Sequence, residues 1–157
     1  MFKYFASIII LFLVDRFSKI YILNLPTGRQ EIHLKGGFFS LHINQDIAFS
    51  LPLSYFILYP LVILILLGLI FSWYKNFKKK SVLIWPLGLL IIGAVSNFLD
   101  RIQYGGVIDF INVPYFTVFN ISDIYISIAV IWILWYSWFY HPKGDHPLGG
   151  KKRAIKQ

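Results

Sequence analysis

Residues 53–74 read LSYFILYPLVILILLGLIFSWY and contain no charged side chain. A helix of roughly 20 apolar residues crosses the ~30 Å hydrocarbon core of a bilayer, so this stretch predicts a transmembrane helix. Three other stretches have a similar apolar character, at residues 2–23, 82–99 and 124–140. The sequence therefore predicts an all-α polytopic membrane protein, in which residues 1–157 form a single membrane domain with four transmembrane helices.

The composition of the whole chain favours the same fold class. The chain is 57% hydrophobic and 14% charged, with a mean hydropathy of +0.65. A soluble domain of 157 residues could not cover so much apolar side chain with polar surface. The first stretch has only Lys3 before its apolar run and no small-residue cleavage site after it, so we expect a retained helix and not a signal peptide.

Positive charges are distributed unevenly between the predicted connections. Ten of them lie near the termini and in the second connection, against three in the first and third. The positive-inside rule therefore places residues 75–81, residues 141–157 and both termini in the cytoplasm, and residues 24–52 and 101–122 outside. We expect the basic tail to contact anionic membrane lipid and not nucleic acid. The ten are Lys3, Lys75, Lys78, Lys79, Lys80, Lys143, Lys151, Lys152, Arg153 and Lys156, and the three are Arg29, Lys35 and Arg101.

The two outer connections are predicted to be extended. Within residues 31–49, apolar and polar side chains alternate with the period of a strand. This pattern predicts a small extracytoplasmic β element. Residues 101–122 are interrupted by glycines and a proline, and we expect them to be extended and partly inserted into the membrane surface. The alternation is clearest where Phe39, Leu41 and Ile43 interleave with Ser40, His42 and Asn44.

Four of the seven acidic residues are predicted to lie in one layer near the outer membrane surface. Asp15 lies about 20 Å along an outward-running first helix, and Asp100 about 27 Å along the third. Asp109 and Asp123 lie just before the fourth helix and at its start. Ionisable groups at membrane depth are costly, so these acids are candidates for a functional site.

Most of these acids also have a structural explanation. An i,i+4 ion pair, a residue pair at the water boundary and a helix N-cap would each account for one of them. Asp109 is harder to explain in this way, because it lies between Ile108 and Phe110 within a hydrophobic stretch. The three structural alternatives are Asp15 with Lys19, Asp100 with Arg101, and Asn120 and Ser122 with Asp123.

The hydrolytic chemistry that the sequence allows is narrow. The chain has no H-E-x-x-H or G-x-S-x-G motif and no cysteine, which also excludes disulfides and cysteine-ligated metals. Two aspartates that share a proton remain, one acting on water and the other on a scissile carbonyl. A small membrane transporter or channel subunit, and a non-catalytic scaffold, stay open as alternatives because intramembrane acids also mark ion pathways.

Five short blocks occur in order along nearly the whole chain. They are DRFSK at 15–19, NQDIAF at 44–49, GAVSNFLDR at 93–101, VIDFI at 107–111 and FNISD at 119–123. In order and spacing these blocks resemble those of the lipoprotein signal peptidases, the signal peptidase II family. The chain departs from the family's pattern at three positions: Asp46 and Ser96 stand where glycine is common, and Ser122 where alanine is common.

The resemblance implies an aspartic endopeptidase of the bacterial cytoplasmic membrane. Its substrate would be a diacylglyceryl-modified prolipoprotein, cleaved just before the lipidated cysteine, and globomycin-type cyclic peptides would inhibit it. No metal or cofactor is implied. The implied catalytic pair is Asp109 and Asp123, and the implied substrate-binding or supporting residues are Asp15, Lys19, Asn44, Asn97, Asp100, Arg101 and Asn120.

These supporting residues have distinct expected roles. We expect Lys19 and Arg101 to balance the charges of the two acids outside the catalytic pair. The three asparagines are expected to offer amide donors and acceptors to an extended substrate backbone, and the sheet predicted within residues 31–49 to cover that substrate.

Overall fold

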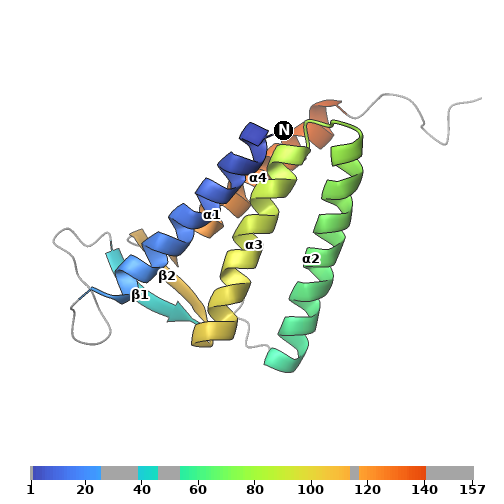
Figure 1. The fold of residues 1–157 in the computed structure, drawn as a ribbon. Helices are drawn as coiled ribbons and strands as arrows, with labels where there is room; N and C mark the ends of the chain where they lie inside the picture. The colour runs from blue at the N-terminus through green and yellow to red at the C-terminus, as the bar shows by residue number, and fades with distance from the viewer. Residues whose placement is uncertain (1, 26–38, 46–53, 114–116, 141–157) are drawn as a thin grey trace, which may run out of the picture.

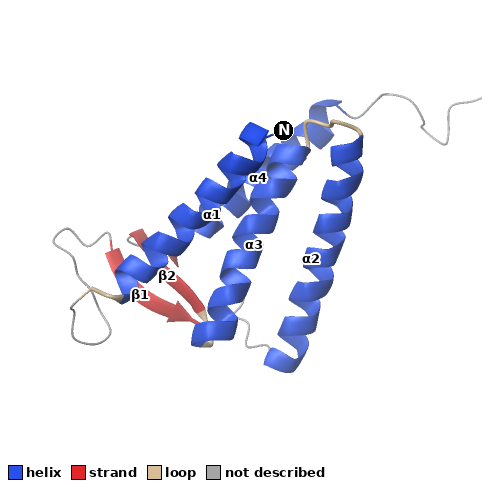
Figure 2. Ribbon diagram, viewed as in Figure 1, coloured by secondary structure: helices blue, strands red, loops and turns tan. Residues whose placement is uncertain are grey.

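The computed structural model describes residues 2–25, 39–45, 54–113 and 117–140 (Figure 1). Within these residues the protein is mostly helical, with one small antiparallel sheet, as predicted (Figure 2). The elements are α1 (Phe2–Leu23), β1 (Phe39–Asn44), α2 (Tyr55–Lys78), α3 (Ile84–Tyr104), β2 (Val107–Val113), β3 (Thr117–Phe119) and α4 (Ile121–Tyr140).

Three helices in the described part of the chain are long and apolar enough to cross a membrane, namely α2, α3 and α4. Helix α1 has a similar length, but Asp15, Arg16 and Lys19 interrupt its apolar sequence. A fourth span therefore stays a prediction.

Helix α3 continues past the predicted end of its span at residue 99 and places Arg101 in its last turn. It ends because Gly105 adopts the left-handed conformation, with φ 72°, and its N–H donates to the Arg101 carbonyl oxygen at 3.1 Å. The outer end of α2 is attached to the same region. The Tyr59 hydroxyl donates to the Arg101 carbonyl and the Tyr55 hydroxyl to the Gly105 carbonyl, at 2.9 and 2.8 Å.

Helix α3 is the centre of the bundle and packs against each of the other three helices. It lies very close to α4 at the buried Gly93. A Cβ at this position would lie 2.8 Å from both the Ser122 carbonyl oxygen and a side-chain carbon of Ile126. Only glycine therefore lets the first turn of α4 lie directly against α3.

Gly93→Ala is expected to lower stability by about 1–3 kcal/mol, because the added methyl group collides with backbone that cannot move cheaply. The thermal midpoint of the purified protein in detergent measures this loss. Gly68→Ala is the matched control, since a Cβ at Gly68 meets nothing within 4 Å. Equal midpoints for the two variants would contradict the proposed close packing.

The three strands form one sheet in the order β1-β2-β3. Asp109 of β2 pairs with His42 of β1, and Ile111 of β2 with Phe119 of β3. The strand predicted from the alternating pattern is thus confirmed over 39–44; the rest of that pattern, with Asp46, lies outside the described residues. Within the second outer connection, residues 107–113 and 117–119 are extended, as predicted, and form β2 and β3. Residues 101–104 are instead helical and belong to α3, so the prediction of an extended chain was wrong there.

The helices alternate in direction, so the start of α1, the α2–α3 turn and the end of α4 lie at one end of the bundle (Figure 1). The sheet lies at the opposite end, beside the ends of α1 and α3 and the start of α4. Residues from all of these elements can therefore meet at the sheet end.

Candidate active site

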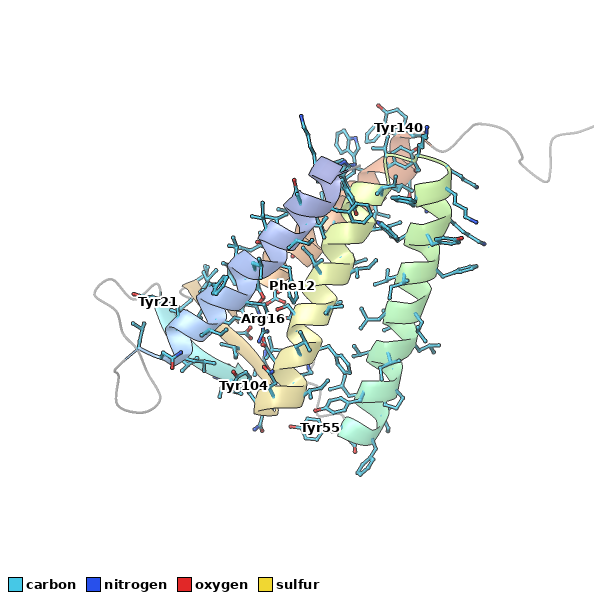
Figure 3. The ribbon with its side chains drawn as sticks, viewed as in Figure 1. Phe12, Arg16, Tyr21, Tyr55, Tyr104 and Tyr140 are labelled. Atoms are coloured by element: carbon cyan, nitrogen blue, oxygen red, sulfur yellow. The ribbon has the colours of Figure 1, made fainter. Side chains whose placement is uncertain are left out.

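Polar side chains are buried together at the sheet end of the bundle. Figure 3 shows side chains filling the space between α1 and α3 around Arg16. Three of these polar residues, namely Asp15, Lys19 and Asp100, are 0% exposed, and Asp109 is only 3% exposed. The structure thus brings together acids that are far apart in the sequence.

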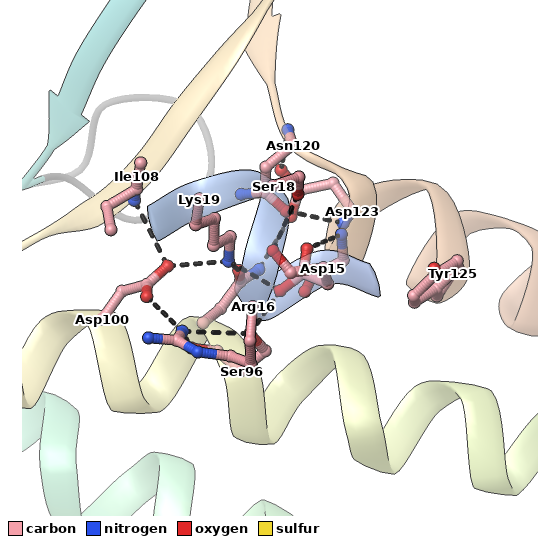
Figure 4. Close-up of polar contacts among 12 residues, drawn as sticks. Asp15, Arg16, Ser18, Lys19, Ser96, Asp100, Ile108, Asn120, Asp123 and Tyr125 are labelled. Atoms are coloured by element: carbon pink, nitrogen blue, oxygen red, sulfur yellow. Dashed lines mark hydrogen bonds and ion pairs between the residues drawn. The ribbon is translucent and has the colours of Figure 1, made fainter. Parts of the chain in front are cut away.

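Two acids and two bases form a buried network between α1 and α3 (Figure 4). The ammonium of Lys19 lies 2.7 Å from Oδ2 of Asp100 and 3.3 Å from Oδ2 of Asp15. It also donates to Oδ1 of Asn97 at 2.9 Å. Nη1 of Arg16 lies 2.5 Å from Oδ1 of Asp100. The formal charges in this network sum to zero, which offsets the cost of burying them.

Arg16 is a residue that our site prediction missed. We expected Arg101 to balance Asp100, but the ion pairs of Asp100 are with Arg16 and Lys19. Arg101 instead donates from Nη1 to the Asn97 carbonyl at 3.3 Å, and its buried Nε has no hydrogen-bond partner in the described structure. The cost of charge at membrane depth applies to Arg16 as much as to its neighbour Asp15, so the sequence did contain the signal.

Asp109 is held by two asparagine amides. Nδ2 of Asn120 donates to its Oδ1 at 2.6 Å, and Nδ2 of Asn44 donates to its Oδ2 at 3.1 Å. Burial raises the pKa of Asp109 from its ordinary value of 3.8 to about 6; the charge of Asp123 adds to this rise, and the two amide hydrogen bonds oppose it. The local environment of Asp109 therefore favours a bound proton.

Asp123 lies in the first turn of α4 and is half-buried. Its Oδ1 accepts from Nδ2 of Asn97 at 2.8 Å, and its Oδ2 accepts from the backbone N–H of Asn120 at 3.2 Å. The backbone N–H of Asp123 donates in return to Oδ1 of Asn120 at 3.0 Å. This reciprocal pair is a capping box, so the predicted N-cap is confirmed.

Asn120 connects the two acids, because its side chain donates to Asp109 while its backbone donates to Asp123. One carboxyl group is thus buried and the other is half-exposed, and both are fixed by amides. Such a pair is suited to general acid and general base chemistry on a substrate at the exposed side. In the described ranges, no three His, Cys, Asp or Glu side chains are grouped so that they could hold a metal ion.

The raised pKa of Asp109 predicts a pH-dependent contribution to stability. The folded protein binds this proton more tightly than the unfolded chain does. The contribution is therefore fully present below pH 3.8 and is lost as the pH rises through about 6. Asparagine has no titrating proton, so the stability of Asp109→Asn relative to the wild type should rise by about 2 kcal/mol between pH 4 and pH 7. Thermal midpoints of both proteins across this range test the prediction; parallel curves would contradict it.

Comparisons with known proteins agree over most of the chain. A family described as signal peptidase (SPase) II matches residues 7–139. A lipoprotein signal peptidase of Streptococcus thermophilus strain CNRZ 1066 is 30% identical, over 85% of this chain and 90% of the relative. Another, of Bartonella henselae, is 36% identical over 77% of this chain and 79% of the relative.

Two solved structures share the fold. One is a bacterial membrane enzyme determined by the in meso method at 2.3 Å, with a TM-score of 0.71 and 23% identity, covering 93% of this chain and 95% of its own. The second, determined by the same method at 1.9 Å, has a TM-score of 0.68 and 24% identity over 85% of this chain and 91% of its own.

Proposed function

The chain belongs to the signal peptidase II family, and we propose on this basis that it removes signal peptides from diacylglyceryl-modified prolipoproteins, cleaving just before the lipidated cysteine. Its apolar helices and its family make it a bacterial membrane protein. The observation that carries the proposal is the convergence of Asp109 and Asp123 on Asn120, at the sheet end of the bundle.

The proposed reaction uses the two aspartates as a dyad. Asp123, the more exposed carboxylate, takes a proton from a water molecule, and the resulting hydroxide adds to the scissile carbonyl carbon. Asp109 gives its proton to the carbonyl oxygen. When the tetrahedral intermediate collapses, the C–N bond breaks, the leaving amine takes the proton that Asp123 received, and the carbonyl returns its proton to Asp109.

The sequence had suggested that the three asparagines bind the substrate backbone. We propose instead that their main role is to orient the two aspartates of the dyad. The side-chain amide of each asparagine donates a hydrogen bond to a dyad carboxylate: Asn44 and Asn120 donate to Asp109, and Asn97 donates to Asp123. Arg101 interacts electrostatically with both dyad residues and retains an unpartnered Nε in the described structure, which leaves it a donor available to the substrate.

We propose that α1 is the fourth transmembrane helix and that both termini are cytoplasmic. The charges of Asp15, Arg16 and Lys19 are directed into the bundle, where Asp100 completes a neutral set, so the outer surface of α1 is left apolar. Five described lysines, Lys3, Lys75, Lys78, Lys79 and Lys80, lie at the opposite end of the helices from the sheet, and by the positive-inside rule this favours an extracytoplasmic sheet. This orientation puts the dyad at the level where a lipid-anchored substrate presents its scissile bond.

A lipidated precursor is expected to be cleaved roughly 100-fold faster than one with an unmodified cysteine, because buried acyl chains add binding energy and fix the depth of the scissile bond. A gel-shift assay with the purified protein in proteoliposomes measures both rates. Equal rates would indicate a general membrane peptidase. Ion or solute uptake without any cleavage would instead favour the transporter alternative. Inhibition by a globomycin-type peptide is expected in the same assay.

A further inference from the structure

We propose that Asp15 and Asp100 are positioning residues with matched roles. Each accepts a hydrogen bond from the backbone amide immediately before one aspartate of the proposed dyad. The inference rests on the proposed function only for its effect on catalysis, because the contacts themselves do not depend on activity.

Asp15 of α1 caps α4 from a different helix. Its Oδ1 accepts from the backbone N–H of Ser122 at 2.8 Å, and both residues are fully buried. The first N–H groups of a helix have no partner within it, and a carboxylate at this end is favoured by the helix dipole. Asn120 already accepts from the N–H of Asp123, so α1 supplies the acceptor for the neighbouring amide. The turn that carries Asp123 is therefore fixed from two sides.

Asp100 of α3 makes the corresponding contact with the sheet. Its Oδ2 accepts from the backbone N–H of Ile108 at 3.4 Å, a longer hydrogen bond than that of Asp15 (Figure 4). Ile108 is fully buried and directly precedes Asp109 in β2. The strand that carries Asp109 is thereby held against α3.

Lys19 joins the two acceptors. Its ammonium lies 2.7 Å from Asp100 and 3.3 Å from Asp15, so the two carboxylates are held at a defined separation. Asp15 is not merely the partner of Lys19 in an i,i+4 pair, because its shorter contacts are with Ser122 and with the Ser96 hydroxyl, which donates to its Oδ2. The distance between the two dyad aspartates is thus set by a single buried unit that belongs to α1 and α3.

Both contacts are made to backbone amides, which gives the test a direct spectroscopic signal. In protein labelled with 15N-serine and 15N-isoleucine, Asp15→Ala should move the Ser122 amide proton upfield and leave that of Ile108 in place. Asp100→Ala should move the Ile108 signal and leave that of Ser122. The two signals are assigned from their absence in Ser122→Ala and Ile108→Val. Because Lys19 joins the two carboxylates, a small movement of the second amide signal is compatible with the inference. An amide signal that does not move when its own acceptor is removed, or that moves more when the other acceptor is removed, would overturn the inference whether or not the protein is active.

The kinetic test uses the lipidated precursor. Asp15→Ala should lower kcat about 100-fold with KM unchanged, and Asp100→Ala should lower kcat less, in keeping with its longer hydrogen bond. Tyr125→Phe is the control for general loosening, because the Tyr125 hydroxyl joins α4 to α1 through a different hydrogen bond, to the Leu11 carbonyl at 3.2 Å. It should keep both amide signals and its kcat.

If the alanine variants do not fold, Asp15→Asn and Asp100→Asn replace them, since an amide oxygen still accepts a hydrogen bond but carries no charge. Each should give a smaller shift at its own amide and a smaller fall in kcat. A shifted amide with wild-type kcat would overturn the positioning role. An inactive wild-type protein whose amides shift as expected would refute the proposed function and leave the contacts standing.

Discussion

Asp109→Asn and Asp123→Asn are each expected to lower the cleavage rate about 1,000-fold or more while the protein still folds, because asparagine has nearly the same shape but cannot exchange a proton. Each carboxylate accepts two hydrogen bonds, one through each oxygen, and the amide oxygen of asparagine can keep one of the two. The measurement is single-turnover cleavage of a lipidated precursor by purified protein.

The double variant should be no slower than either single variant, since the two groups act as one unit. Asp100→Asn is the matched control, because it neutralises a buried acid of the same cluster that lies outside the dyad, and it should lose activity only in part. Binding of globomycin would verify that each variant is assembled. Full cleavage by a well-folded Asp109→Asn or Asp123→Asn protein would refute the dyad and leave Asn120 and Asp123 as a helix cap alone.

The helices were largely predictable because hydropathy is a local property of the chain. The first predicted stretch, residues 2–23, coincides with α1, and the strand inferred from alternating residues appears as β1. Helix α3 continues to Tyr104, past residue 99, where the predicted apolar span ends, because hydropathy marks the apolar part of a helix and not its last hydrogen-bonded turn. Gly105, whose left-handed conformation terminates the helix, was the better signal.

The acids of the site were predictable from their depth, but their partners were not. The Arg16–Asp100 pair joins residues 84 positions apart, and it depends on how α1 and α3 are rotated about their axes. Hydropathy says little about that rotation. Arg101 is adjacent to Asp100 in sequence and looked like its natural partner, but consecutive helical residues point in directions about 100° apart.

The structural and functional explanations of the acids also proved compatible. The Asp15–Lys19 ion pair and the Asn120–Asp123 capping box both exist, and both belong to the buried cluster. A helix cap satisfies backbone donors and at the same time fixes the side chain that provides it. For this reason, a local structural role for Asp123 does not argue against its place in the proposed dyad.

Lys19→Met is expected to cost about 3–5 kcal/mol of stability, because methionine fills a similar volume but leaves a net negative charge buried in the cluster. All three donors of the Lys19 ammonium are used, by Asp15, Asn97 and Asp100, and the side chain has no exposed surface. The variant should show a much lower thermal midpoint and a smaller monodisperse fraction in size-exclusion chromatography.

Adding Asp100→Asn to Lys19→Met should restore a large part of this loss. The double variant again balances its formal charges, since Asp15 and Arg16 remain and are connected through the Ser96 hydroxyl. The amide oxygen that Asp100→Asn introduces would still accept a hydrogen bond from the Ile108 N–H. If the double variant were less stable than Lys19→Met, the cost would come from lost hydrogen bonds and packing, and not from uncompensated charge. Recovery of the midpoint would identify charge balance as the property that lets a helix with this many ionisable residues pack inside the bundle.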